Sequence, residues 1–224
     1  MVRITTPHVP LPASDRLEDA VMPSSARIAT EVKRALDSKA QADLVWSVRR
    51  GTVEHVVGGV VAENVDATSI KGVVSKWAAL KWLNQQAALS PVPAALVSGN
   101  QRYAVGEHVK IELQGAKYPH LTLFNLPPDG RVEFFIPDPG KFDEANKDWS
   151  REAIHEEFKV DKPPYGAEHM VAIFSKDDLP DLHAALASMT TPDRAQALRP
   201  MLEQVLSGKD AQIGVIDIYT GAER

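Results

Sequence analysis

The side chains of this sequence that could carry acid–base or metal chemistry are seven histidines and the carboxylates beside them. The closest pairings are Glu168-His169 and the HEE run at residues 155–157. HEE lacks the four-residue spacing with which HExxH places two imidazoles of one helix face on a zinc ion. A metal site made of His120, His155 and His169 would have to be assembled by the fold. Ordinary surface or strand histidines are the alternative interpretation.

Several other classes of site lack the residues that they need. The chain has no cysteine, which excludes thiolate nucleophiles, zinc-thiolate sites and iron–sulfur clusters. The acidic residues at 138–148 lack the alternate spacing of a calcium loop. The glycine-containing loops at 98–100 and 207–209 have neither the glycines of a phosphate-binding loop nor the context of a G-x-S-x-G elbow. The sequence therefore predicts no catalytic residue, no cofactor and no metal.

The loop KPPYGAEH at residues 162–169 is the most distinctive in the chain. Its two prolines restrict the backbone, and its glycine permits a sharp reversal. Tyr165, Glu168 and His169 would then present an aromatic face and two polar tips on a rigid base. Such a surface suits a peptide or a small polar ligand, and a purely structural corner is the alternative. We predict that these three residues and His120 bind a ligand or partner.

Composition narrows the range of partners. A net charge of −5 with no block of basic residues argues against nucleic acid as a partner. No window approaches the ~20 apolar residues that a membrane-spanning helix needs, so we expect a soluble chain. The first residues have no signal-peptide pattern and leave the compartment undetermined; a periplasmic or secreted location would follow if the chain were a fragment of an exported protein.

The elements that must position these side chains begin with a predicted β-meander from Val109 to Pro137. Apolar and polar residues alternate at 109–113 and 132–136, and Asp129-Gly130 supplies a turn between strands. The segment 121–126 is apolar on both faces, so we predict a central strand with Leu123 buried. Further strands are predicted around residues 44–48, 53–57, 169–175 and 211–219.

Helices are predicted at about 25–39, from Thr68 to the prolines at 91 and 93, and in two segments between Ser175 and Gly208. A helical turn or two is also expected within 144–157, and Ser175 with Asp178 resembles a capping box. In the second helix Ile70, Val73, Val74, Trp77 and Leu80 form the apolar stripe. Lys71, Lys76 and Lys81 are spread around it and are expected to be solvated.

These elements favour a mainly β chain with added helices (α+β), an antiparallel β-sandwich with helices packed at an edge or end. We expect an extended tail or linker at 1–23 and a single domain at 24–224. Within that domain, 24–76 would be a connector plus first strands, and 77–221 would be the main module.

The order of motifs YAVGEHVKIELQG, YPHLTLFNLPPDGRVEFFIP, FKVDKPPYGAEHMVAIFSKDDLPDL and QIGVIDIYTG resembles the bacterial domain of unknown function that follows caspase-like cysteine peptidase domains. The resemblance covers roughly Trp77 to Gly221. It implies a non-catalytic accessory module, binding or regulatory, whose partner would be a caspase-like peptidase domain in cis or in trans. The alternative is a hydrolase with a His/carboxylate site near His169. A pocket holding a histidine with a strongly shifted pKa would favour that alternative.

Overall fold

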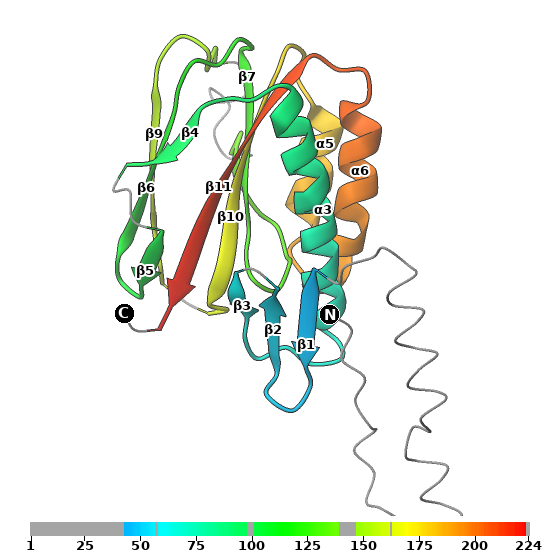
Figure 1. Cartoon of the computed structure of the whole chain (residues 1–224). Coiled ribbons are helices and arrows are strands. Elements are labelled where there is room, and N and C mark those ends of the chain that lie inside the picture. The colour runs from blue at the N-terminus through cyan, green and yellow to red at the C-terminus, as the bar shows by residue number, and fades with distance from the viewer. Residues whose placement is uncertain (1–42, 57, 98–100, 139–146, 162, 223–224) are drawn as a thin grey trace, which may run out of the picture.

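The computed structural model describes residues 43–56, 58–97, 101–138, 147–161 and 163–222. Their strands form an eight-stranded sheet and a three-stranded sheet. Figure 1 shows three layers, in which the small sheet lies on one face of the large sheet and the helices lie on the other. The predicted α+β class, an antiparallel sandwich with added helices, is confirmed.

The large sheet is organised around β10, which spans Gly166–Ser175. It pairs antiparallel with β11 along its whole length, and on its other side with β7 and, at Gly166, with β3. β8 pairs with β7, β1 and β2 continue from β3, and β5 pairs parallel with β11. The strands are β1 (Leu44–Ser47), β2 (Thr52–His55), β3 (Gly59–Ala62), β5 (Arg102–Ala104), β7 (His120–Leu126), β8 (Glu133–Ile136) and β11 (Ala211–Gly221).

The small sheet contains β4 (Ala94–Leu96), β6 (His108–Leu113) and β9 (Ile154–Lys159), in that order. The prediction of one continuous meander is therefore wrong in part, because β6 pairs with β4 and β9 and not with β7. The residues between β6 and β7 carry the chain from one sheet to the other. The expected helical turn is also wrong at 154–157, where the chain is part of β9.

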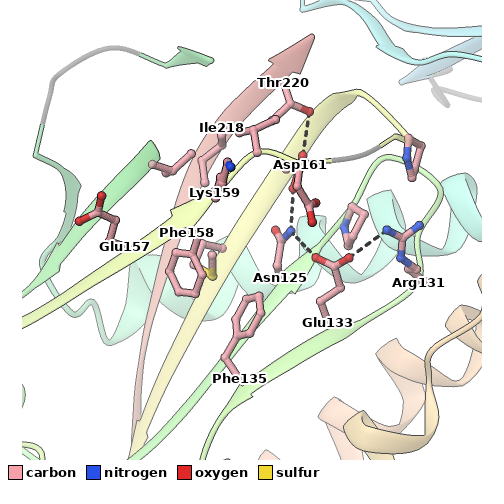
Figure 2. Close-up of a pocket in the computed structure, with 16 residues that line it drawn as sticks. Asn125, Arg131, Glu133, Phe135, Glu157, Phe158, Lys159, Asp161, Ile218 and Thr220 are labelled. Carbon is pink, nitrogen blue, oxygen red and sulfur yellow. Dashed lines mark hydrogen bonds and ion pairs between the residues drawn. The ribbon is translucent and has the colours of Figure 1, made fainter. Parts of the chain in front are cut away.

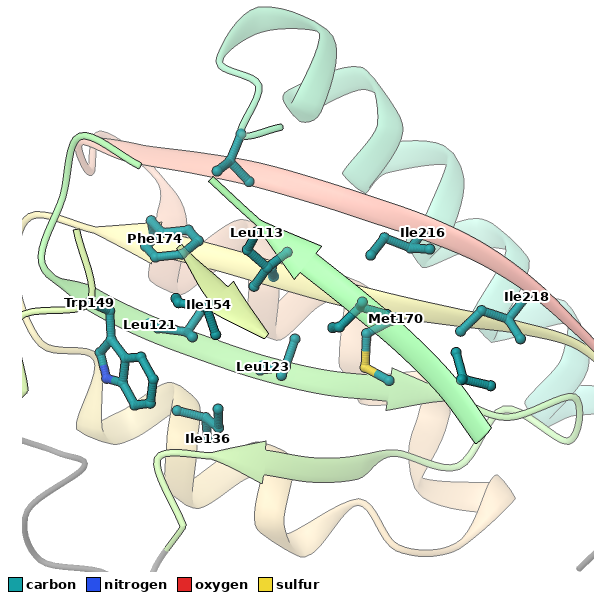
Figure 3. Packing of buried hydrophobic residues seen from close by; sticks show 14 of the residues in the cluster. Leu113, Leu121, Leu123, Ile136, Trp149, Ile154, Met170, Phe174, Ile216 and Ile218 are labelled. Carbon is teal, nitrogen blue, oxygen red and sulfur yellow. The ribbon is translucent and has the colours of Figure 1, made fainter. Parts of the chain in front are cut away.

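The sandwich core lies between the two sheets (Figure 3). The alternation of apolar and polar residues predicted for β6 is confirmed, since its apolar residues are buried against the large sheet. Leu123 of β7 is fully buried, and every residue from 121 to 126 is buried, as predicted for a central strand. The cluster includes Leu113, Leu121, Leu123, Ile136, Trp149, Ile154, Met170, Phe174, Ile216 and Ile218.

The helices cover the opposite face of the large sheet, and not an edge or end of the sandwich as expected, because their apolar side chains pack against that face. They are α3 (Ile70–Leu89), α5 (Pro180–Ser188), the 3-10 helix η1 (Pro192–Ala197) and α6 (Leu198–Leu206). Their apolar side chains enclose Phe124, Val171 and Ile173, which project from β7 and β10. The predicted capping box at α5 is wrong, because no side chain caps that helix. The tail predicted at 1–23 and the helix predicted at 25–39 lie outside the described residues.

The prediction for the lysines of α3 is wrong at Lys76. Lys76 is fully buried, whereas Val74, which was placed on the apolar stripe, is half exposed. The core face of α3 consists of Gly72, Val73, Lys76, Ala79, Leu80 and Leu83. A lysine fits there because its stem packs among apolar neighbours while its ammonium group reaches backbone carbonyls.

Candidate functional site

The alternation of β10 directs Glu168 and His169 to opposite faces of the large sheet. Glu168 lines a cavity between the two sheets, which we call the inter-sheet cavity. His169 lines a groove on the side of the helices, which we call the helix-side groove. The loop predicted as one binding surface thus contributes to two separate sites.

The inter-sheet cavity has a volume of about 440 Å³. Figure 2 shows polar side chains gathered at one side of it and aromatic side chains at the other. The polar residues on the first side lie on β7, β8, β10 and β11, in the β7–β8 turn and between β9 and β10. They are Asn125, Arg131, Glu133, Asp161, Glu168 and Thr220. Two further charged residues, Glu157 and Lys159 of β9, line the cavity on the side of Phe158.

Glu168 is the centre of the polar network. Its Oε1 accepts a hydrogen bond of 2.7 Å from Thr220 Oγ1, and its Oε2 accepts one of 2.7 Å from Asn125 Nδ2. Asn125 Nδ2 also donates to Glu133 Oε2 at 3.2 Å. One amide nitrogen therefore holds two carboxyl groups side by side by donating a hydrogen bond to each.

Arg131 does not neutralise this pair on its own. Its guanidinium group is divided between Glu133 Oε1 at 2.9 Å and Asp129 Oδ2 at 2.7 Å. Asn125 is 4% exposed, and its Oδ1 has no hydrogen-bond partner among the described residues. Figure 2 shows this oxygen turned away from Glu133, toward the side of the cavity where Phe158 lies. The polar end is consequently rich in acceptors and poor in donors.

The charges of the lining agree with this imbalance, since the described residues that line the cavity include four acidic and two basic ones. The acidic ones are Glu133, Glu157, Asp161 and Glu168, and the basic ones are Arg131 and Lys159. Glu157 points away from the others in Figure 2 and forms an ion pair with Lys110.

Apolar side chains form the opposite wall of the inter-sheet cavity. Phe135 of β8 and Phe158 of β9 face each other with ring centroids 4.7 Å apart. Val109, Met170 and Ile218 complete this wall. The cavity thus combines an anionic end with an apolar wall long enough to contact an aliphatic stem.

The helix-side groove, with a volume of about 1240 Å³, lies between α3, the β1–β3 hairpins and the end of β11. His169 Nε2 lies 3.7 Å from Asp217 Oδ1, while the buried His169 Nδ1 has no hydrogen-bond partner among the described residues. The Trp77 ring contacts His169 edge-on at 5.2 Å and stacks on His55 at 4.8 Å. Burial lowers the pKa of His169 well below its usual value, and the nearby Lys76 and His55 lower it further.

Lys76 lies between the cavity and the groove. Its Nζ donates to Pro127 O at 3.0 Å and to Ala167 O at 2.5 Å. Burial lowers the pKa of Lys76 to about 7, although Glu168, Asp129 and Asp217 oppose the shift. The ammonium group therefore titrates near neutral pH directly behind the residues that line the inter-sheet cavity.

A third polar arrangement has the order of a hydrolase triad. Thr122 Oγ1 lies 2.8 Å from His183 Nε2, and His183 Nδ1 lies 3.7 Å from Asp178 Oδ1. Thr122 is 1% exposed, and none of the three residues lines the inter-sheet cavity or the helix-side groove. Because the Thr122 side chain is buried, we interpret this contact as one that holds α5 against β7.

The structure separates the residues that the sequence predicted as one surface. Glu168 and His169 line different sites, and Tyr165 is half-buried and packs against the sandwich core. His120 pairs with Ser175 at the far end of β10 from His169. His155 is exposed on β9 in the small sheet, so the three candidate metal-binding histidines are not brought together.

Sequence reasoning missed Asn125, Glu133, Thr220, Asp217 and Trp77. One signal was available for the first three. Each is a polar residue of a strand that lies two residues from an apolar residue on the same face: Leu123 for Asn125, Phe135 for Glu133 and Ile218 for Thr220. A polar residue in such a position needs partners, which often belong to a site.

Among the described residues, no three histidine, aspartate or glutamate side chains lie close enough together to hold a metal ion. None of the described helices is long and apolar enough to span a membrane. No protein-family model matches the chain, and no curated protein matches it.

Proposed function

We propose that the chain is a non-catalytic binding module that receives a basic side chain of a partner protein in the inter-sheet cavity. The observation that supports this function is the hydrogen-bonded group of Asn125, Glu133 and Glu168, in which two carboxylates share one amide donor. A guanidinium or ammonium group supplies the donors that this end lacks. Charge-assisted hydrogen bonds of this kind contribute about 1.5–3 kcal/mol each.

The apolar wall supports the same ligand class. A lysine or arginine carries its charge on an aliphatic stem, which would lie against Phe135, Phe158 and Met170 while the charged end reaches Glu133 and Glu168. Arginine matches the site better, because its planar fork can bond to two carboxylates at once. We therefore rank arginine above lysine as the preferred side chain.

The resemblance to the accessory domain of caspase-like peptidases belongs to this proposal. A module beside such a peptidase would present or retain a basic segment for it, in cis or in trans. The chain would contribute recognition, and the peptidase domain would supply the chemistry. Adding a caspase-like peptidase domain to the purified chain, with and without arginine peptides, tests this part through the peptidase rate.

Calorimetry with blocked pentapeptides tests the binding itself. The peptides carry arginine, lysine, citrulline or norleucine at the central position and are otherwise identical. We expect arginine to bind best, lysine next, and the neutral analogues at least tenfold more weakly. Equal affinity for arginine and citrulline would overturn the proposal, because the site would then ignore charge.

Variants locate the binding in the cavity. Glu168→Gln and Glu133→Gln each remove one charge at nearly constant volume, and each is expected to weaken arginine-peptide binding by tenfold or more. Glu203→Gln, which makes the same chemical change on α6, is the control and should bind as the parent does. Glu203 pairs with Arg199 and does not line the cavity.

A hydrolase acting through His169 is the second candidate function. The observation that favours it is a buried histidine with a lowered pKa beside Asp217 in the helix-side groove. This site ranks second because no serine or threonine is among the described residues that line the groove, so a water molecule would have to be the nucleophile. Turnover of peptide, ester or phosphoester substrates that is lost in His169→Ala would support it. Hydrolysis rates equal to those in buffer alone would rule out the hydrolase function.

A further inference from the structure

Lys76 and the inter-sheet cavity share their electrostatic surroundings. The ammonium group of Lys76 is held by the carbonyl of Ala167, the residue before Glu168, and by the carbonyl of Pro127, which itself lines the cavity. Glu168 raises the pKa of Lys76 through its charge. A cation that entered the cavity would approach the same carboxylate from the opposite face of the sheet.

The charged and titratable groups around Lys76 come from four directions. Glu168 and His169 lie on β10, Asp217 on β11, and Asp129 in the turn between β7 and β8, where it pairs with Arg131. His55 on β2 lies beyond His169. The lowered pKa of His169 leaves its imidazole neutral at pH 7, and the guanidinium of Arg131 does not lose a proton in this range. Lys76 is therefore a buried group here that can give up positive charge near neutral pH.

We propose that Lys76 is a proton-linked regulator of the inter-sheet cavity: a basic side chain bound beside Glu168 displaces a proton from Lys76 to the solvent, so that affinity rises with pH. This inference rests on the proposed function, because it needs a cation in the cavity. Two positive charges that share one carboxylate repel each other more strongly in a buried site than in water. Loss of one proton relieves that repulsion.

The two hydrogen bonds of Lys76 behind the cavity remain possible when its ammonium group loses a proton. A neutral amine keeps two N–H donors, which is the number that Pro127 O and Ala167 O require. Titration of Lys76 therefore changes the charge behind Glu168 without removing either hydrogen bond. The proposed effect is electrostatic and does not require the strands to separate.

Calorimetry of the arginine peptide in buffers of different ionisation heat measures the protons released on binding. We expect the full chain to release a fraction of a proton near pH 7. If the bound peptide lowers the pKa of Lys76 by one unit, the Kd falls about tenfold from well below to well above that pKa. Lys76→Met, which keeps the length of the stem, should release no proton and show a nearly flat Kd across the same range.

A second measurement does not depend on that variant folding. NMR of the chain with 13C at the lysine Cε positions follows the titration of Lys76 directly, and its midpoint should move to lower pH when the arginine peptide is bound. An unchanged midpoint, or equal proton release in the parent and Lys76→Met, would overturn the linkage while leaving the binding function intact. Absence of arginine-peptide binding at every pH would instead overturn both.

Discussion

Glu168 and His169 are consecutive residues of β10, yet their side chains line two different cavities on opposite faces of the large sheet. Glu168 belongs to a hydrogen-bonded group with Asn125 and Thr220, and His169 contacts Trp77. A change at one position therefore alters one site directly and the other only indirectly, through the backbone and through the charge of Lys76. Variants at the two positions can thus distinguish the proposed binding function from the hydrolase alternative.

Tyr165 and Glu168 should have separable effects, although both lie in the loop predicted to bind a partner. Tyr165 packs against the sandwich core, so Tyr165→Ala should lower the free energy of unfolding by about 1–3 kcal/mol. Glu168→Gln should weaken arginine-peptide binding while the melting temperature changes little. Chemical denaturation and calorimetry on both variants check this. A large loss of arginine-peptide binding in Tyr165→Ala at unchanged stability would instead support the sequence-based prediction that Tyr165 belongs to the binding surface.

Leu123→Ala should destabilise the chain by about 2–5 kcal/mol, from lost transfer free energy and the cavity that remains. Leu123 is fully buried between the two sheets, on a strand flanked by β8 and β10. Leu89→Ala is the matched control, because Leu89 is 79% exposed at the end of α3. Urea denaturation of the two variants compares them. A cost below half a kcal/mol at Leu123 would contradict the central position of β7.

The strands and the long helix follow from the sequence because their patterns are local. Each pattern spans only a few neighbouring residues. Apolar and polar residues alternate along β6, apolar residues occupy both faces of β7, and prolines end α3. The assignment of β6 to the small sheet was not predictable, since alternation shows that one face is buried and not which strand covers it. Pairing between strands that are distant in the sequence decides to which sheet β6 belongs.

The candidate site was predicted only at Glu168, for a similar reason. Asn125, Glu133 and Thr220 are far apart in the sequence and meet through the register of β7, β8, β10 and β11. Lys76 was misassigned because helical spacing alone cannot tell a solvated lysine from one that meets two carbonyls of distant strands.

Stability should rise with pH above 7 because of Lys76. Its pKa is about 7 in the folded chain and near 10.5 when unfolded, so between these values the unfolded state binds more protons. The free energy of unfolding should therefore increase with pH in this window, with a slope approaching about 1.4 kcal/mol per pH unit. Lys76→Met should lack this component. Urea denaturation of both chains from pH 7 to 9.5 measures the two slopes, and parallel slopes would show that Lys76 is not the source.

Gly130 should tolerate substitution far less than Gly106, although both have a φ of +87°. A Cβ on Gly106 would meet no atom within 4 Å, whereas a Cβ on Gly130 would lie 2.2 Å from Gly72 O of α3. Gly106→Ala therefore carries only the cost of the left-handed backbone, of the order of 1 kcal/mol. Gly130→Ala adds a clash with helix backbone that a side-chain movement cannot relieve.

The consequence of Gly130→Ala should extend to the inter-sheet cavity. The turn 127–130 contains Pro127, which lines the cavity and whose carbonyl oxygen accepts a hydrogen bond from Lys76 Nζ. Displacing this turn from α3 should cost clearly more stability than Gly106→Ala and also weaken arginine-peptide binding, even at a temperature where the variant is still folded. Denaturation and calorimetry measured side by side on the two variants test this. Equal losses of stability would mean that the turn can move away from α3 at no cost, and unchanged binding would mean that the cavity does not depend on its position.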